Sequence, residues 1–300
     1  MTTAGEWWIG ARPRTLVAGA MPVVVGAAAS GTSRLRWEFG AALVVAIGLQ
    51  IGVNYANDAF DGMRGVDTAE RLGPPRLVAS GTASGSTVLA AALVALLVAA
   101  GAGLALAITT SPLPILALGA LALISALLYS GGPRPYAGLG LGELMVFLFF
   151  GLMATCGTSY VVGGSVTAAA WWSGAALGLL AVSILVANNL RDIATDDAAG
   201  KRTLAVRLGA VRTRLLYRAC LVGAFAVVCI GVVASLVDQD VGITKWALVA
   251  LVAWPLAVPP MDAVGSATGR DLIPVLVATA RLEAGFGAAL TLGLLLERTT

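Results

Sequence analysis

Long apolar stretches separated by short polar segments run through the whole chain. Each stretch has about 15 to 25 residues, the length at which a helix crosses the hydrocarbon core of a membrane. None alternates apolar and polar residues in the manner of barrel strands. The pattern predicts nine membrane-spanning helices, at 16–30, 39–57, 87–109, 113–130, 142–163, 172–190, 214–236, 245–261 and 281–297.

The composition indicates an integral membrane protein with a single domain. Of the 300 residues, 58% are hydrophobic and 12% are charged, whereas soluble domains carry about 25% charged residues. No segment between the spans is long enough for a soluble domain, and the 37 glycines allow helices to approach one another closely in lipid. We therefore expect an all-α polytopic bundle formed by residues 1–300 and surrounded by membrane lipid.

The first apolar run allows two interpretations. Arg12 and Arg14 precede it, and it ends in three alanines, as in a cleaved signal peptide. Because eight further hydrophobic spans follow, an uncleaved first span is the preferred interpretation.

Basic residues are divided unequally between the two sides that nine spans define. Fifteen lie on the side of the N-terminus and four on the other, which places the N-terminus in the cytoplasm by the positive-inside rule. They are scattered over short loops rather than gathered on one face, which argues against a nucleic-acid partner. The bias of 17 Arg over 2 Lys is typical of a GC-rich bacterial genome, so we expect a location in the bacterial inner membrane.

Two clusters of Asn and Asp interrupt the apolar chain, at 57–61 and 188–192. Each contains an Asn-x-x-x-Asp pattern and is followed by a further acid, Asp67 or Asp196. Ionised carboxylates at the edge of a bilayer cost several kcal/mol unless another group pairs with them. Both clusters end a span on the predicted cytoplasmic side. We interpret them as parallel pseudo-repeats, near 54–67 and 188–197, whose acids bind cations.

The spacing of these acids favours a metal site. Asn188, Asp192 and Asp196 are spaced i, i+4 and i+8, and would share one face of a helix over about 12 Å. Like charges one turn apart repel, whereas carboxylate and amide oxygens suit Mg²⁺, which also coordinates substrate phosphates. Asp58 and Asp197 point off the stripe. The candidate metal ligands are Asn57, Asp58, Asp61, Asp67, Asn188, Asp192 and Asp196.

Basic side chains flank both clusters. They would bind diphosphate oxygens and stabilise the charge of a leaving group. The alternative is that they only set the topology and contact lipid headgroups. The candidate diphosphate-binding residues are Arg64, Arg71, Arg76, Arg191, Lys201 and Arg202.

A third polar segment, from Tyr129 to Tyr136, follows the fourth span. Its glycines and prolines predict a rigid turn, in which Arg134 would face an aromatic carboxylate; an interfacial anchor is the alternative. Glu143 is interpreted as a helix-start charge. The chain has no His, and its three cysteines lack metal-ligand spacing, which excludes histidine-based catalysis and imidazole or thiolate metal sites.

These motifs resemble the UbiA superfamily of intramembrane aromatic prenyltransferases over the whole chain. The NDxxD motif at 57–61 with Asp67, and the NxxxDxxxD motif at 188–196, look like its two Asp-rich diphosphate-binding motifs. The runs NYANDAFDGMRGVDTAERLGPPRLVASG (54–81) and NNLRDIATDDAAGKRTLAVRLG (188–209) are most similar to its 1,4-dihydroxy-2-naphthoate polyprenyltransferases. Asp61 and Asp67 stand six residues apart, where many members have four, and this spacing fits the same group.

The resemblance implies a lipid-open central cavity and a Mg²⁺-dependent prenyl transfer. A polyprenyl diphosphate held by both motifs would lose diphosphate, and 1,4-dihydroxy-2-naphthoate would attack the allylic carbocation. Loss of CO₂ would then give demethylmenaquinone, in menaquinone biosynthesis. The residues so implied in catalysis are Asp61, Asp67, Asp192 and Lys201, with Asp67 as the candidate general base. Those implied for the aromatic substrate are Tyr129, Arg134 and Tyr136.

Two alternatives stay open at this point. A member of the same superfamily could use another aromatic acceptor, such as 4-hydroxybenzoate or homogentisate. A cation-coupled transporter would also use intramembrane acids. It predicts them near the middle of the spans, whereas here they cluster at helix ends beside basic loops.

Overall fold

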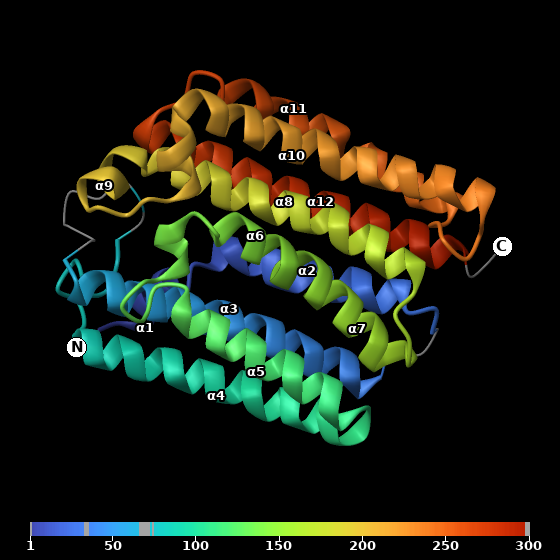
Figure 1. Cartoon of the computed structure of the whole chain (residues 1–300), viewed down its shortest axis with the longest axis horizontal. Coiled ribbons are helices and arrows are strands. Elements are labelled where there is room, and N and C mark those ends of the chain that lie inside the picture. Colours follow the sequence, from blue (N-terminus) through green and yellow to red (C-terminus); the bar gives the residue numbers. More distant parts are fainter. Residues whose placement is uncertain (1, 33–35, 66–72, 74, 298–300) are drawn as a thin grey trace.

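The computed structural model describes residues 2–32, 36–65, 73 and 75–297. Across these residues long helices lie side by side, and no strand occurs (Figure 1). The predicted spans correspond to α2 (Leu16–Ala29), α3 (Trp37–Met63), α4 (Gly85–Thr109), α5 (Pro112–Leu128), the continuous segment α6–η3–α7 (Gly142–Val146, Phe147–Met153, Ala154–Gly163), α8 (Ala168–Arg191), α10 (Leu204–Val237), η4–α11 (Lys245–Ala253, Trp254–Ala263) and α12 (Leu272–Leu296).

The prediction of an all-α membrane bundle is confirmed. Within the described residues, seven of these segments are long and apolar enough to cross a membrane. The other two, α5 and α2 with its preceding turn η1 (Pro13–Thr15), are shorter apolar helices. The predicted number of nine is therefore approximate, although each predicted span does contain a helix.

Several helices are longer than the sequence predicts. α3 continues to Met63, because the polar side chains of its last turns are buried inside the protein and do not mark a lipid boundary. α10 begins early, at a cap formed by the Thr203 side chain, and bends at Gly209, where φ is 73°. α12 also begins early, at Leu272, so Arg281, the first residue of the predicted last span, lies well inside the helix.

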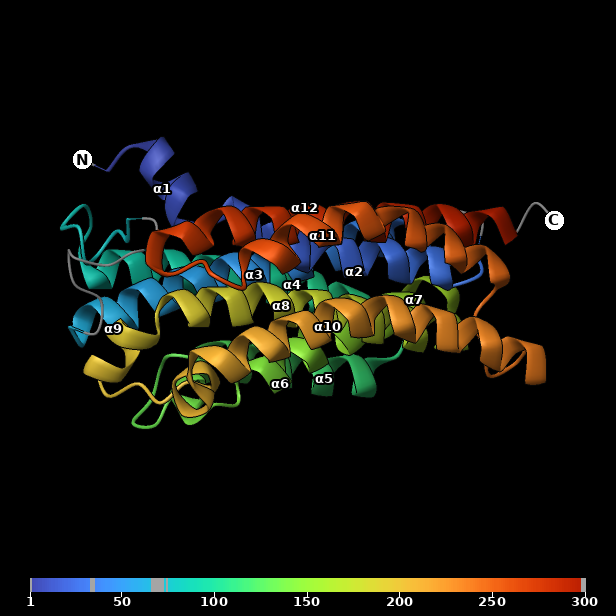
Figure 2. The ribbon, with the colours of Figure 1, turned by 90° about the horizontal axis from the view of Figure 1, so that it is seen from above.

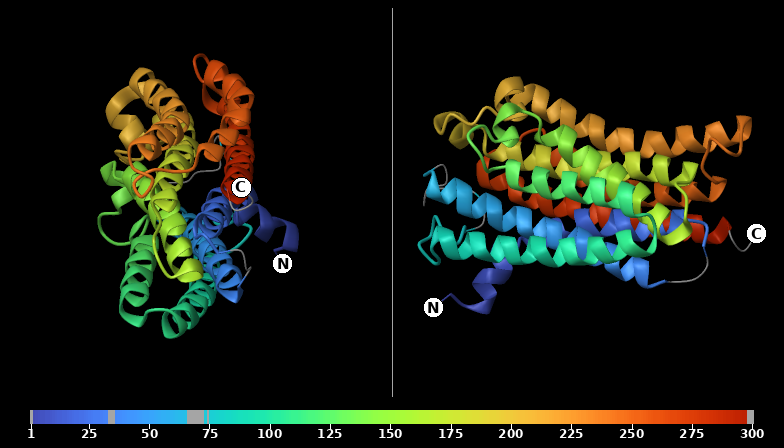
Figure 3. Two further views of the ribbon diagram at one scale, coloured as in Figure 1. Left: turned by 90° about the vertical axis from the view of Figure 1, so that its right-hand side faces the viewer. Right: turned by 60° about the horizontal axis from the view of Figure 1, so that its bottom comes forward.

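The elements fall into two groups joined by α2. α4 and α5 pack with α3, whereas α8, α10, α12 and η4 form the largest buried apolar core. Seen along the bundle, α4 and α5 lie on the opposite side from α10 and α11 (Figure 3). α2 contacts α3, α7, α8 and α12 and lies between the groups (Figure 1). An internal space bounded by both groups follows from this arrangement.

Glycine allows the closest of these approaches. A methyl group at Gly151 would stand 2.5 Å from Cα of Gly178, so only a residue without a side chain lets η3 pack on α8. η3 itself is a seven-residue π-helix in the middle of a span, a rare conformation that is frequent at functional sites. Phe149 and Phe150 of this segment line the internal space, whereas Phe147 packs against the apolar core.

Both acidic clusters lie at the same end of the bundle. The C-terminal end of α3 and the short helix α9 (Ile193–Ala198) are both at the left in Figure 1, near α1 (Ala4–Gly10). The C-terminal end of α12 lies at the opposite end (Figure 2). The remaining short elements, η2 (Tyr136–Leu139) and η5 (Gly269–Asp271), are connections. The fold thus brings residues 130 positions and more apart in sequence to one polar end.

Candidate active site

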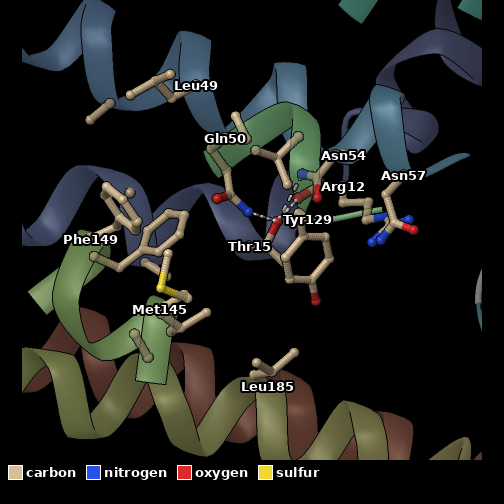
Figure 4. A pocket seen from close by; sticks show the side chains of 18 of the residues that line it. Arg12, Thr15, Leu49, Gln50, Asn54, Asn57, Tyr129, Met145, Phe149 and Leu185 are labelled. Atoms are coloured by element: carbon tan, nitrogen blue, oxygen red, sulfur yellow. Dashed lines mark hydrogen bonds between the residues drawn. The ribbon is translucent and has the colours of Figure 1, made fainter. Parts of the chain in front are cut away.

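A cavity of about 630 Å³ occupies the internal space. Its polar end is lined by Lys201 and by Asn57, Asp58, Asn188, Asn189, Asp192 and Asp196, and its deeper part by aliphatic and aromatic side chains of α2, α3, α5, η3 and α7. Asp61 lines a smaller neighbouring pocket that shares Tyr129 and Lys201 with this cavity. Figure 4 shows part of the lining, with Asn57 at one side and Phe149 and Leu49 at the other. The cavity therefore offers a charged site continuous with an apolar chamber.

The first cluster is held by cations from other segments. Asp61 at the end of α3 is 4% exposed, and its Oδ2 lies 3.4 Å from Nζ of Lys201 and 3.9 Å from Nη2 of Arg76. Nη1 of Arg76 also donates to Oδ1 of Asn57, at 3.3 Å. The pair of Asp61 and Lys201 joins the two halves of the sequence at this end of the bundle.

The second cluster contains a two-point ion pair between neighbouring residues. Nε and Nη2 of Arg191 donate to the two carboxylate oxygens of Asp192, at 2.7 and 2.6 Å, and Nη2 also donates to Oδ1 of Asn188 at 2.9 Å. The prediction of one continuous helix was wrong in detail. α8 ends at Arg191 and the chain turns at Asp192, whose ψ is 6°, before α9 begins. Asn188, Asp192 and Asp196 nevertheless line the same cavity.

Two predicted site residues serve the neighbouring loops. Asp58, predicted as a metal ligand, accepts hydrogen bonds from the backbone N–H groups of Leu77 and Val78, at 2.8 and 3.1 Å. It anchors this loop, and its geometry gives no support to a place among the metal ligands. Arg64 donates to the carbonyl oxygens of Ser130 and Gly132, at 2.8 and 2.6 Å, and so clamps the turn after α5.

The residues predicted to bind the aromatic substrate lie in different places in the structure. Tyr129 and Tyr136 line the large cavity, with ring centroids 5.4 Å apart in an edge-to-face contact, and burial raises the pKa of Tyr136 to about 12. Arg134 is exposed and lines the smaller neighbouring pocket, together with Asp61 and Lys201, but not the large cavity. Arg202 is exposed and is absent from the described lining of both. Asp67 and Arg71 lie outside the described residues.

The donor set fits a divalent metal bound together with a diphosphate. Among the described residues no three acidic or sulfur-bearing side chains are gathered into a ready-made metal cluster. The carboxylates of Asp61 and Asp192 instead contact cations. Such cations can transfer to phosphate oxygens while the carboxylates turn to a hard metal ion. The site thus has the charges for a metal–diphosphate pair.

Sequence reasoning missed a polar group on the wall of the chamber. The large cavity is also lined by Arg12 and Thr15, which precede α2, and by Gln50 and Asn54 on α3. Sequence reasoning also missed a contact beside the second cluster, where Asn189 donates a hydrogen bond to Oε1 of Glu143 at 2.9 Å. The signal for the first group was present, because Gln50, Asn54, Asn57 and Asp61 recur at helical spacing on α3.

The fold and site together define a multi-pass membrane protein with an internal chamber, charged at one end and apolar along its depth. Such a chamber suits an anionic headgroup joined to a hydrocarbon tail. The chain belongs to the UbiA prenyltransferase family, whose model matches residues 19–259. The resemblance seen in the two Asp-rich motifs is thereby confirmed.

Relatives and solved structures agree with this assignment. The chain is 46% identical to 1,4-dihydroxy-2-naphthoate octaprenyltransferase of Mycobacterium tuberculosis, over 92% of each chain. It is 37% identical to the protein of the same name from Escherichia coli, over 72% of each. A UbiA homolog from Aeropyrum pernix shares the fold with a TM-score of 0.69 at 17% identity, over 94% of this chain and 98% of that one. A UbiA homolog from Archaeoglobus fulgidus bound to GPP and Mg²⁺ has a TM-score of 0.60 at 17% identity, over 95% and 99%.

Proposed function

We propose that this protein transfers a polyprenyl group from polyprenyl diphosphate to 1,4-dihydroxy-2-naphthoate, with loss of diphosphate and CO₂, to give demethylmenaquinol, the reduced form of demethylmenaquinone. The single observation that carries the proposal is the cavity, in which Asn and Asp side chains of both motifs meet three cations at the mouth of an apolar chamber. The identity to naphthoate prenyltransferases over nearly the whole chain supports the choice of acceptor.

Binding would begin with an exchange of ionic partners. Asn57, Asp61, Asn188, Asp192 and Asp196 would hold Mg²⁺, which would neutralise the diphosphate and favour its departure. Lys201, Arg76 and Arg191, which now contact the carboxylates or their neighbours, would move to phosphate oxygens. Since arginine and lysine bind phosphate strongly in sites shielded from water, this exchange would stabilise the leaving group.

The apolar chamber would control the reactive carbon. When the C–O bond of the prenyl diphosphate breaks, its electron pair leaves with the diphosphate and an allylic cation remains. Side chains such as Met145, Phe149 and Leu185 line the adjoining wall (Figure 4) and would keep water from the cation. The electron-rich naphthalene ring would form the new C–C bond, and loss of the carboxylate as CO₂ would return its electron pair to the ring.

Residues near the polar end would orient the acceptor. Tyr136, with its pKa raised to about 12, stays protonated at neutral pH and can donate a hydrogen bond. Arg12 lines the same part of the cavity and lies beside Tyr129 (Figure 4), where a carboxylate would find a cation. We place the acceptor carboxylate there rather than at the exposed Arg134. The general base, where one is needed, stays assigned to Asp67.

The proposed location is the bacterial inner membrane, with the N-terminus and the polar end of the cavity in the cytoplasm. Bacterial relatives support the compartment, and the excess of basic residues supports the orientation. A polyprenyl tail would then remain in the hydrocarbon core while the diphosphate meets the aqueous side.

A product assay tests the proposal. Purified protein in detergent is given farnesyl diphosphate and Mg²⁺, with 1,4-dihydroxy-2-naphthoate or 4-hydroxybenzoate as acceptor, and products are identified by mass spectrometry. We expect a prenylated naphthoquinol without the carboxylate. Product from 4-hydroxybenzoate alone would overturn the acceptor but keep the reaction class. Folded protein that gives neither product would overturn the proposal.

A further inference from the structure

A buried amide faces the chamber about two helical turns deeper than the acidic site. Gln50 lies seven residues before Asn57 on α3, which places it about 10 Å along the helix axis and on the same face. Its side chain is buried, with 8% exposed. It lines the large cavity opposite Met145 and Phe149 (Figure 4).

The hydrogen bonds of Thr15 fix the orientation of this amide. The Thr15 hydroxyl donates its one proton to the carbonyl oxygen of Arg12, at 2.9 Å. Its oxygen can then only accept, and it accepts from Nε2 of Gln50 at 2.9 Å and from Nδ2 of Asn54 at 3.2 Å. A flipped Gln50 would place its oxygen against Thr15, and the hydroxyl would have to give up its bond to Arg12 to avoid two opposed acceptors. The amide therefore keeps its nitrogen toward Thr15 and its oxygen turned away, as Figure 4 shows.

The oxygen left by this arrangement is a buried acceptor. Oε1 of Gln50 has no hydrogen-bond partner among the described residues and no contact with solvent. Burying a carbonyl without a partner costs about 1–3 kcal/mol, so a group held in this state points to a ligand that supplies the missing donor. Apolar side chains that line the same cavity, such as Leu49, Met145 and Phe149, have no donor to offer it.

We infer that Gln50 is a specificity-determining residue that accepts a hydrogen bond from a ring hydroxyl of the aromatic acceptor. This inference rests on the proposed function. In a 1,4-dihydroxy-2-naphthoate, the hydroxyl beside the carboxylate bonds internally to it, so the free donor is the hydroxyl on the far side of the ring. That hydroxyl meets Oε1 of Gln50, the carboxylate points toward the cationic end, and the ring lies against Phe149 and Met145.

The arrangement predicts discrimination between acceptors. A site built around one hydrogen bond rejects an analogue that lacks the matching group, because its own polar atom is then left unpaired. The ratio of kcat/KM for 1,4-dihydroxy-2-naphthoate to kcat/KM for 1-hydroxy-2-naphthoate should therefore be larger than the difference in reactivity of the two rings alone would give. This preference should depend on Gln50, and on Thr15 through its hold on the amide.

The test compares kcat/KM for these two acceptors in detergent-solubilised wild type and Gln50→Met, a change that keeps the shape but removes the amide. We expect the preference for the dihydroxy acceptor to fall by about 10-fold or more, as the loss of one hydrogen bond of about 1.4 kcal/mol predicts. The KM for farnesyl diphosphate should stay unchanged. If the monohydroxy compound is not turned over, its inhibition constant against the dihydroxy acceptor takes the place of kcat/KM.

Controls separate recognition from folding. Val44→Met places the same residue on α3 at a position outside the described cavity lining, with 43% of Val44 exposed, and should leave the preference unchanged. If the amide served only to pack α2 on α3, Gln50→Met would lower the thermal midpoint of unfolding. We expect the midpoint of Gln50→Met to equal or exceed that of wild type, because the substitution removes a buried unpaired oxygen. Thr15→Val, which lets the amide flip, should weaken the preference, and Thr15→Ser should restore it.

The outcomes distinguish this inference from the proposed function. No naphthoate product with wild-type protein would refute the proposed function itself. Normal wild-type turnover, combined with an unchanged preference in Gln50→Met, would refute only the role of Gln50. A lower thermal midpoint with equal losses on both acceptors would show that Gln50 is purely structural.

Discussion

Asp61→Asn is the substitution that most directly perturbs the junction of the two motifs. It keeps the shape of a buried side chain and removes one negative charge, beside Lys201 at 3.4 Å and Arg76 at 3.9 Å. At an effective dielectric constant near 20, each of these pairs has a gross Coulomb energy of about 4–5 kcal/mol, most of which is offset by desolvation. In the variant, the ammonium group of Lys201 can be solvated by water, and Arg76 keeps its hydrogen bond to Asn57. We therefore expect a loss of only about 1–2 kcal/mol in stability.

The expected loss of activity is larger. The substitution removes a charged ligand for the metal and disturbs the positions of two cations that would bind the leaving group. Single groups of this kind contribute about 10²–10³-fold in rate, and both effects together predict a loss of about 10³-fold in kcat/KM, or about 4 kcal/mol. The assay is product formation by mass spectrometry at saturating Mg²⁺. Asp240→Asn, at an exposed position, is the matched control and should retain full activity.

A double-mutant cycle adds a sharper criterion. Lys201→Gln alone should cost about 10²-fold. If Asp61 and Lys201 act on the same bound diphosphate, the double variant should lose about as much as Asp61→Asn alone, because residues that act as a unit are not additive. Activity of Asp61→Asn within threefold of wild type would refute the reasoning. A double variant whose losses multiply would refute the shared site.

Four further predictions concern the metal, a loop, an exposed arginine and a helix contact. Chelation of Mg²⁺ should stop turnover, and added Mg²⁺ should restore it; an unchanged rate would contradict metal-assisted departure. Asp58→Ala should lower the free energy of unfolding by about 1–3 kcal/mol, so reduced turnover at an unchanged thermal midpoint would reject its role as a loop anchor. Arg134→Ala should change the KM for the acceptor less than threefold, and a large rise in this KM would show that Arg134 belongs to the acceptor site. Gly151→Ala should destabilise the bundle, because its methyl would stand 2.5 Å from Gly178; a normal thermal midpoint would show that the helices can separate.

Hydropathy and motif spacing predicted most of the architecture. Because a membrane helix must be apolar over a length fixed by the bilayer, each predicted span contains a helix. The motif positions placed both acidic clusters at one end, where α3 and α9 now bring them. Exact helix ends were less predictable. The polar residues that mark a lipid boundary elsewhere are buried at the end of α3, and the helix continues past them.

Side-chain partners in the site were not predictable from the sequence. Asp58 and Asp61 stand one turn apart in the same motif, yet one binds a loop backbone and the other contacts Lys201. Arg64 and Arg76 are both basic residues near the first motif, but only Arg76 reaches the carboxylate. These choices depend on where the connecting loops fold back, which local spacing does not determine.

The missed amide illustrates the same limit. Gln50 has no sequence motif, and a single glutamine in an apolar helix is consistent with many environments. Its significance comes from α2 packing against α3, which brings Thr15 to its nitrogen and leaves its buried oxygen without a partner among the described residues. Only tertiary structure joins residues 35 positions apart in this way.

Binding of radiolabelled farnesyl diphosphate, measured with and without Mg²⁺, tests the central claim that both motifs hold one metal-bound diphosphate. Wild type, Asp61→Asn on α3 and Asp196→Asn on α9 are compared by equilibrium binding in detergent. The account predicts Mg²⁺-dependent binding in wild type and an increase in Kd of about 100-fold or more in each variant, about 2.7 kcal/mol. Binding that is independent of Mg²⁺, or that survives either substitution unchanged, would contradict it.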